Sequence, residues 1–396
     1  MIPIDKNQFH PYYQTVFSIE DTSIYGHEIL SRDMNSTPPS LPDPFLNQTG
    51  HDEFRDAIET SVLEKAFSEY KMNPIGKLFI NLSPDRLLRD LEEDSKVTGR
   101  RSILSLVEFY QIPAQNIYLE ILEVSSLRSL DSLATAVELA KQMGYSIAMD
   151  DVGSESSNLE RLGALQPDII RIDLILLKKS LQSKRYKSIL EYLKDLSVGI
   201  GAELLFEGIE TLEEMNLAID SSARYLQGFL LDMPSRERRI SDHKNKALES
   251  NLNQFHLTKR KYILDEIDFE EKTRNILQKL VISFKNIQNI LHIDVQSIFF
   301  ASPQIMRVYA TDWNGNQISP YYERTVATSF KQESKSIGKN WSYMSYFYKH
   351  IKLSFRYKNT WNTLEPYFDS KLGQAVLVFS KVIENEAILF IDVTLP

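Results

Sequence analysis

The chain has 396 residues, of which 42% are hydrophobic and 25% charged, and its net charge is -9. This length is sufficient for a large core and more than one domain, whereas the acidic balance argues against a nucleic-acid scaffold and against nucleic-acid polymers as partners. The absence of Cys excludes disulfides, thiolate zinc sites and a cysteine nucleophile. Because no apolar run approaches the roughly 20 residues that span a bilayer, and the first residues lack a secretory pattern, we expect no membrane span and a cytoplasmic location.

Short apolar runs alternate with helical segments over residues 1–240. The opening runs, 12–19 and 23–30, are joined by a short connection, which predicts an antiparallel hairpin. Periodic segments between the later runs predict parallel strands with crossover helices. The later strands are expected at 77–82, 117–122, 146–149, 168–172, 202–206 and 224–230, and helices at 54–71, 129–143 and 180–196.

Eight strands interleaved with helices predict an α/β fold, a TIM-like (β/α)8 barrel whose first strand is antiparallel. An open doubly wound sheet fits the same periodicity, so the pattern leaves both architectures open.

Polar side chains end most of these strands. In a barrel the carboxyl ends of the strands form the active site, and carboxylate and amide oxygens are the ligands that Mg²⁺ and Mn²⁺ prefer. A site with two such ions can activate water and stabilise a departing phosphate ester oxygen. Each residue alone has a plainer explanation: a helix cap for Asn81, solvated glutamates at 120 and 123, or a polar loop at Asp150-Asp151. The strand ends contribute Glu28, Arg32, Asn81, Glu120, Glu123, Asp150, Asp151, Arg171, Asp173, Glu207, Glu210 and Gln227.

Taken in order, residues 9–236 resemble the EAL-domain family, phosphodiesterases that act on the bacterial second messenger cyclic di-GMP. The family's name motif appears as Glu28-Ile29-Leu30, followed by Arg32. The remaining motifs are Asn81-Leu82-Ser83, Glu120 to Glu123, Asp150-Asp151, Glu207-Gly208-Ile209-Glu210 and Gln227-Gly228.

The resemblance implies hydrolysis of cyclic di-GMP to linear pGpG with one or two Mg²⁺ or Mn²⁺ ions. It assigns metal binding to Glu28, Asn81, Glu120, Asp150, Asp151 and Glu207, and catalysis to Glu28, Asp151, Arg171, Glu207 and Gln227. Substrate contacts are assigned to Glu28, Leu30, Arg32, Asp173, Glu210, Gln227 and Pro234, and support of the loop after the double Asp to Glu123.

Two departures from the family pattern leave a second function open. The family has Lys where this chain has Arg171, and an arginine stays protonated and cannot serve as a base. The loop 152–158 lacks the aromatic residue that the family places after the double Asp. Both departures threaten turnover more than binding, so the alternative is a receptor that holds cyclic di-GMP with little or no hydrolysis.

The sequence changes character after residue 240, which predicts domains at 1–240, 241–293 and 294–396. Residues 242–291 contain no Pro or Gly and are expected to form a helical linker, with an apolar stripe of Ile276, Leu280, Phe284, Ile287 and Leu291. We expect this stripe either to pack on its own domain or to pair with the same helix of a second subunit. We also expect the protein to be a homodimer.

The last hundred residues are expected to form an antiparallel sheet with helices on it. Strands are expected at 297–301 and 307–310, a turn at 312–316, and a hairpin of 374–383 with 387–395. The segment 361–373 resembles PAS-like or Cache-like sensor domains. The domain is therefore expected to bind a small ligand, with a dimerisation module as the plainer alternative.

Overall fold

The structure is a computed structural model that describes residues 7–42, 52–92, 102–122, 129–150, 158–239, 245–280, 282–287, 290–326, 329–357, 359–369, 371–384 and 386–395. Its contacts divide the chain into two compact units, Met1–His256 and Leu257–Pro396. Among the described residues, no helix combines the length and the apolarity needed to cross a bilayer.

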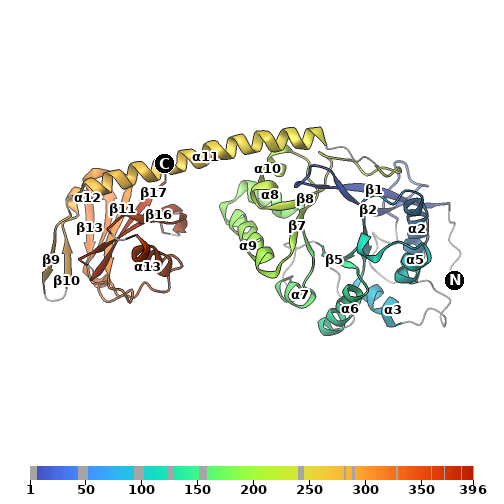
Figure 1. Cartoon of the computed structure of the whole chain (residues 1–396), viewed down its shortest axis with the longest axis horizontal. Helices are drawn as coiled ribbons and strands as arrows, with labels where there is room; N and C mark the ends of the chain where they lie inside the picture. Colours follow the sequence, from blue (N-terminus) through green and yellow to red (C-terminus); the bar gives the residue numbers. More distant parts are fainter. Residues whose placement is uncertain are drawn as a thin grey trace. The chain divides into compact units, whose positions relative to one another are not determined.

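A closed barrel of eight strands forms the first unit (Figure 1). Strand β1 is antiparallel to both of its neighbours, β2 and β8, and all other pairs are parallel. The pairing of β8 with β1 confirms the predicted barrel and excludes the open doubly wound sheet. The strands are β1 (Phe9–Ser18), β2 (Ile24–Asp33), β3 (Lys77–Leu82), β4 (Ile117–Ile121), β5 (Ser146–Met149), β6 (Ile169–Ile172), β7 (Glu203–Phe206) and β8 (Ala223–Leu226).

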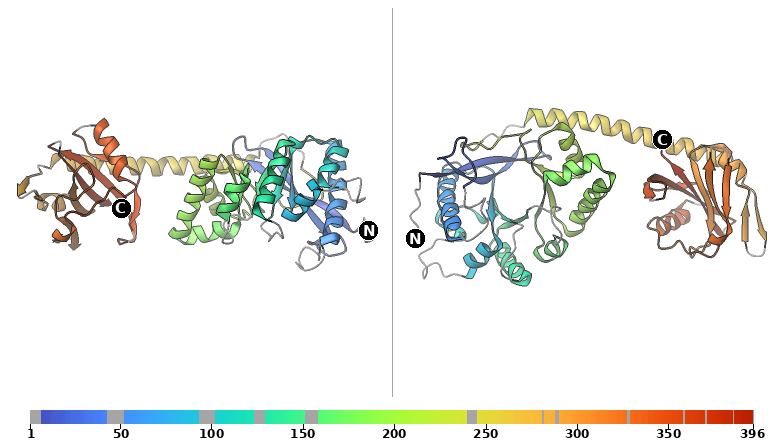
Figure 2. Two further views of the ribbon diagram at one scale, coloured as in Figure 1. Left: turned by 90° about the horizontal axis from the view of Figure 1, so that it is seen from below. Right: turned by 180° about the vertical axis from the view of Figure 1, so that it is seen from behind.

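Helices surround the barrel on its outer face (Figure 2). The segment expected as one helix at 180–196 is two helices, because Ser183 is extended at φ -141° and ψ 121° and interrupts the run. The described helices of this unit are α2 (Asp52–Met72), α3 (Pro84–Glu92), α5 (Ile103–Phe109), α6 (Leu130–Gln142), α7 (Asn158–Leu165), α8 (Leu174–Gln182), α9 (Lys184–Ile200) and α10 (Leu212–Asp220), with a 3-10 turn η1 (Ala114–Asn116).

Large side chains close the barrel interior at one level. Tyr118 stacks on Phe79 with ring centroids 4.6 Å apart, and Tyr25 stacks on Tyr225 at 4.2 Å. The Tyr25 and Tyr118 hydroxyls lie 2.6 Å apart, so these partly buried polar groups satisfy each other. We call this cluster the aromatic floor; its members are Val16, Tyr25, Phe79, Tyr118, Ala148, Ile169, Leu205 and Tyr225.

The second unit is an α+β domain built on an antiparallel sheet in the order β13-β12-β11-β17-β16-β14, with β15 also paired to β16. The predicted hairpin is confirmed, because β16 and β17 pair along their length. Its strands are β11 (Ile305–Thr311), β12 (Tyr321–Val326), β13 (Ser329–Glu333), β14 (Asn362–Thr363), β15 (Tyr367–Asp369), β16 (Gln374–Ile383) and β17 (Ala387–Thr394), with helices α12 (Gln296–Ala301) and α13 (Phe347–Arg356) and a turn η2 (Ser334–Ser336).

Two predictions for the later part of the chain are wrong. Helix α11 (Lys246–Lys279) ends before Leu280, and the last three residues of the expected stripe lie in a two-stranded sheet of β9 (Phe284–Ile287) and β10 (Ile290–Ile293). The run expected as a strand at 297–301 is helix α12, whose Ile298 and Phe299 pack into the core of the second unit. In both segments a short apolar run fits either period, and tertiary packing decides between them.

A buried ionic cluster crosses the sheet of the second unit. Arg307 on β11 lies directly opposite Asp392 on β17, with Nη1 and Oδ2 3.6 Å apart. Arg307 also donates to both carboxylate oxygens of Asp369, at 3.3 Å for Oδ1, and Nε donates to Glu323 at 3.3 Å. Burial acts against ionisation of Asp369, but Arg307 and two backbone N–H groups lower its pKa to about 2. Burial raises the pKa of Asp392 to about 7, because Arg307 compensates it only in part.

The Asp392 carboxyl therefore makes the stability of the second unit depend on pH. Between about pH 4 and 7 the unfolded chain releases a proton that the folded state keeps, so stability falls as pH rises through this window. Between pH 5 and pH 8 we expect the Tm of the second unit to fall in the wild type and to fall by several degrees less in Asp392→Asn, since ~1 kcal/mol corresponds to roughly 4 °C. Tryptophan fluorescence follows this unit alone, because Trp313, Trp341 and Trp361 are the chain's three Trp residues.

The matched control is Asp265→Asn, an exposed position on helix α11. It should keep the wild-type dependence on pH. Equal losses of Tm in Asp392→Asn and in the wild type would show that Asp392 is not the group responsible.

Candidate functional site

A layer of polar side chains lies directly beyond the aromatic floor, toward the carboxyl ends of the strands. On six strands the polar residue is two positions after a floor residue, as Glu120 is after Tyr118 and Arg171 after Ile169. Because side chains of a strand alternate between its faces, residues two apart share the barrel interior. We call this layer the polar ring; its members are Glu28, Asn81, Glu120, Asp150, Arg171, Glu207 and Gln227.

Arg171 holds the centre of the polar ring. Its side chain is buried on β6, with 3% of the residue exposed. The guanidinium donates to Glu120 and Glu207 through short hydrogen bonds, and Nη2 donates to Glu28 Oε2 at 3.1 Å. Gln227 Oε1 accepts from Nη2 at 3.3 Å, and Asp150 Oδ1 lies 3.3 Å from Nε. Five side chains, each from a different strand or strand end, therefore contact this one guanidinium.

Glu28 is the second centre of contacts in the ring. The Asn81 amide donates to Glu28 Oε1 at 2.7 Å, and the Gln227 amide donates to Glu28 Oε2 at 2.8 Å. Burial alone would raise the pKa of Glu28, but the Arg171 charge and these hydrogen bonds outweigh burial and lower it. Glu28 is therefore an ionised carboxylate whose orientation is fixed by amide donors on β3 and after β8.

The ring contains four acidic groups and one basic group. Burial raises the pKa of Glu120 well above its usual value, and it raises the pKa of Glu207 to about 8, with Arg171 opposing both shifts in part. Burial lowers the pKa of Arg171, but the facing carboxylates outweigh burial and raise it well above its usual value. One guanidinium thus compensates the four acidic groups only in part, and a further cation would favour their ionised forms.

The residues of the ring fit a hard divalent cation. Their donors are carboxylate and amide oxygens, which Mg²⁺, Mn²⁺ and Ca²⁺ take as ligands. Glu120 Oε2 is buried and has no hydrogen-bond partner among the described residues. In the part of the chain that the structure describes, no three acidic or histidine side chains already stand in a metal-binding arrangement.

The other predicted site residues lie outside the polar ring or outside the described residues. Asp151 and Glu123 lie outside the described residues. Arg32 on β2 is half-buried, and its Nη1 donates to the Ser31 carbonyl at 2.9 Å. Asp173 precedes helix α8, and its carboxylate makes no capping hydrogen bond. Leu30 and Pro234 are half-buried.

Glu210 is not brought into the polar ring. Its side chain is exposed after β7, and Oε2 accepts from Lys178 Nζ at 2.8 Å. A substrate contact by Glu210 stays a prediction.

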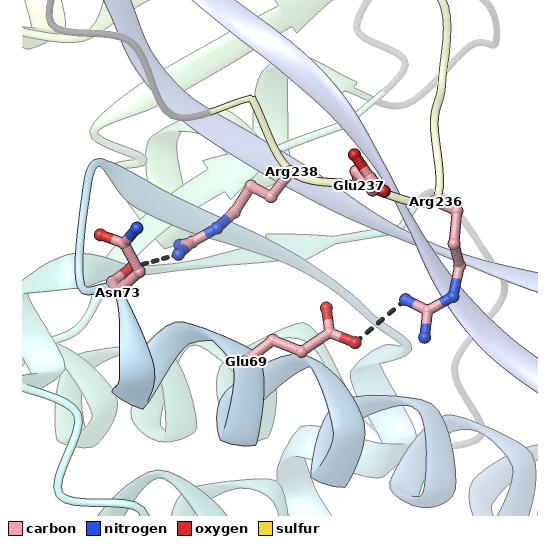
Figure 3. Close-up of a pocket in the computed structure, with 5 residues that line it drawn as sticks. All are labelled: Glu69, Asn73, Arg236, Glu237 and Arg238. Carbon is pink, nitrogen blue, oxygen red and sulfur yellow. Dashed lines mark hydrogen bonds and ion pairs between the residues drawn. The ribbon is translucent and has the colours of Figure 1, made fainter.

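A hollow of about 480 Å³ lies elsewhere on the unit, beside helix α2 (Figure 3). Arg236 reaches from the later segment to Glu69 on α2, with Nη1 and Oε1 3.0 Å apart, and Arg238 donates to the Asn73 carbonyl (Figure 3). The residues that line it are Glu69, Asn73, Arg236, Glu237 and Arg238. Because its arginines are engaged by the protein and no residue of the polar ring lines it, we assign the chemistry to the ring.

Comparisons with known proteins find a matching family model for each of the two parts of the chain. A family model described as the EAL domain matches residues 2–234, and one described as an EAL-domain associated signalling protein domain matches residues 240–395. The chain is 28% identical to the uncharacterized EAL-domain containing protein YkuI of Bacillus subtilis, over 96% of this chain and 93% of that protein. The resemblance to the EAL family is thereby confirmed, whereas the likeness of the second unit to PAS-like or Cache-like domains stays a prediction.

Other relatives match a smaller share of the chain. The chain is 25% identical to the cyclic di-GMP phosphodiesterase RocR of Pseudomonas aeruginosa, over 61% of this chain and 61% of RocR. It is 29% identical to the probable cyclic di-GMP phosphodiesterase PdeA of Escherichia coli, over 52% of this chain and 28% of PdeA. The match spans less than two thirds of the length of either protein.

The fold of the whole chain is also found in a solved structure. The crystal structure of Bacillus subtilis YkuI in complex with substrate c-di-GMP and calcium superposes with a TM-score of 0.84, at 24% identity, over 99% of this chain and 97% of that chain. This likeness shows that the two chains share a fold across both units.

Gly228 holds the end of β8 against the loop after β7. A Cβ at this position would lie 2.1 Å from the backbone N of Ile209 and 2.2 Å from its O. We expect Gly228→Ala to push these segments apart, to displace the neighbouring Gln227 and to lower the Tm of the first unit. All three Trp residues lie in the second unit, so the calorimetric transition that tryptophan fluorescence does not report is that of the first unit.

Gly199→Ala is the matched control for this substitution. A Cβ at Gly199 meets nothing within 4 Å, and the position is in helix α9, where Ala is favoured by up to about 1 kcal/mol. A Tm of Gly228→Ala equal to that of Gly199→Ala would contradict the tight approach at Ile209.

Proposed function

Because the chain belongs to the EAL domain family, we propose that it binds cyclic di-GMP and hydrolyses it to linear pGpG in a reaction that needs divalent metal ions. The observation that carries this proposal is the polar ring, which gathers buried carboxylates at the mouth of a barrel around a deficit of positive charge. Such a site suits a phosphodiester, whose cleavage requires neutralisation of charge on phosphate and an activated water.

The polar ring would hold the metal, and its neighbours would hold the nucleotide. Glu28, Asn81, Glu120, Asp150 and Glu207 of the ring, together with Asp151, would bind the ions. Bound divalent ions supply Lewis-acid polarisation of the phosphate and lower the pKa of a water. The amides of Asn81 and Gln227 hold the Glu28 carboxylate in one orientation, which keeps its oxygens aimed into the mouth.

Substrate contacts would come from around the ring. Arg32 is half-buried beside Glu28 on β2, and its guanidinium would pair with a phosphate. Asp173, two residues beyond Arg171, would accept hydrogen bonds from a guanine. The half-buried Leu30 and Pro234 would offer apolar contact.

A second candidate is a receptor that binds cyclic di-GMP with little turnover. The observation that favours it is Arg171, which engages the carboxylates of the ring and stays protonated, so that it cannot accept a proton from water. The two functions differ in product formation and not in nucleotide binding.

Removal of one carboxylate of the ring tests the proposed hydrolysis of cyclic di-GMP. We expect Glu28→Ala to reduce pGpG formation by at least about 100-fold, the usual scale for losing a group that stabilises transition-state charge. Chromatography of the products in Mg²⁺ and in Mn²⁺ measures the rate. Glu203→Ala is the control, because Glu203 is an exposed glutamate at the opposite end of β7, and it should keep the wild-type rate. If cyclic di-GMP binds tightly but no pGpG forms over hours in either metal, the protein is a receptor and the proposed hydrolysis is wrong.

We propose further that the second unit regulates the first. Support comes from the family model for residues 240–395, which is described as a signalling domain associated with EAL domains. The regulated quantity would be the rate of pGpG formation, with a small ligand as the signal.

Loosening the core of the second unit should therefore change the kcat of the full chain. Phe347 is fully buried on helix α13 and its neighbour Tyr348 is 64% exposed, so Phe347→Ala and Tyr348→Ala form a matched pair. Phe347→Ala is expected to destabilise the unit by about 3–5 kcal/mol, which tryptophan fluorescence measures, and to shift kcat. If the unit is loosened and kcat equals that of Tyr348→Ala, the second unit has no regulatory effect.

A further inference from the structure

We propose that Arg171 is the resident cation of the polar ring and competes with divalent metal for the same carboxylate oxygens. The proposal rests on the proposed function for the identity of the ring as a metal site. It adds that metal is admitted only when the guanidinium gives up its contacts. The substitution of Arg for the Lys expected in this family then sets how much metal the protein requires.

The contacts of Arg171 carry the first step. Its guanidinium is paired with the carboxylates of Glu28, Glu120, Asp150 and Glu207, which are the four acidic ring residues expected to bind metal. It also takes Gln227 Oε1 as an acceptor. Metal and guanidinium therefore draw on one set of oxygens.

The geometry of the two cations makes their contacts incompatible. A guanidinium is a planar fork, and here its nitrogens stand 3.1 Å from Glu28 Oε2 and 3.3 Å from Asp150 Oδ1. A hard divalent cation gathers its oxygens around a point at about 2.0–2.6 Å. The same carboxylates cannot converge on a point while they are spread around the fork, so one cation must leave when the other binds.

The burial of Arg171 makes this competition matter. At 3% exposure the guanidinium is taken out of water, and its ion pairs are not screened as surface pairs are. A lysine would present a single ammonium point charge on a flexible stem and would engage fewer of these oxygens at once. The apparent affinity for metal is therefore lowered by the fraction of molecules in which the guanidinium has released the ring.

The test measures Mn²⁺ binding to the full chain without nucleotide, by calorimetry at fixed ionic strength. Arg171→Met removes the charge and keeps an unbranched side chain, whereas Arg185→Met removes an exposed arginine from helix α9. We expect Arg171→Met to bind Mn²⁺ more tightly than the wild type by about 10-fold or more, a usual size of coupling between two ligands. Arg185→Met should bind Mn²⁺ as the wild type does.

A second readout separates competition from a general loss of structure. Without metal, Arg171→Met leaves the ring carboxylates without their cation, so calorimetry should show a lower Tm for the first unit, and Mn²⁺ should raise that Tm more than it does in the wild type. If Arg171→Met does not fold, Arg171→Lys takes its place, and it should also bind Mn²⁺ more tightly than the wild type.

The outcomes distinguish this inference from the proposed function. Equal or weaker Mn²⁺ binding by the folded Arg171 variant would overturn the competition and leave the proposed phosphodiesterase in place. Failure of Mn²⁺ to bind to any variant would overturn both, because the ring would then not be a metal site. Binding that is tightened in the Arg171 variant and lost in Glu120→Ala would support both.

Discussion

A single guanidinium faces four carboxylates inside the mouth of the barrel, and the rest of the site is arranged around that imbalance of charge. Closure of the sheet brings the strand ends around one axis, and the period of two along a strand sets a polar residue above six of the eight residues of the aromatic floor. The floor excludes water from below, which strengthens every charge interaction above it. In this structure the cation that faces the carboxylates is the Arg171 guanidinium.

Much of this arrangement could be predicted from the sequence, because it follows from local pattern. Apolar runs of four to six residues marked β3 to β7, and each polar ring residue after Asn81 lies at or just beyond a strand end. The contacts of Arg171 could not be predicted, since Glu28 and Gln227 are 143 and 56 residues away along the chain. The aromatic floor was missed as well, although for six of the seven ring residues the residue two positions earlier was its signal.

The failed predictions share a physical cause. Leu280, Phe284, Ile287 and Leu291 have helical spacing, yet β9 and β10 pair as a short hairpin beyond the end of α11. The five residues 297–301 fit a strand by composition, and they are helical because Ile298 and Phe299 pack into the core of the second unit. Short runs carry too little information to fix their own structure, and contacts distant in sequence decide it.

The most direct measurement is the anomalous scattering of Mn²⁺ in crystals of the full chain with cyclic di-GMP. We expect Mn²⁺ within the ring, with Glu28, Glu120 and Asp150 as ligands, and the Arg171 guanidinium moved away from those oxygens. A ring without Mn²⁺ at saturating metal, in which Arg171 still bridges the carboxylates beside bound nucleotide, would contradict it.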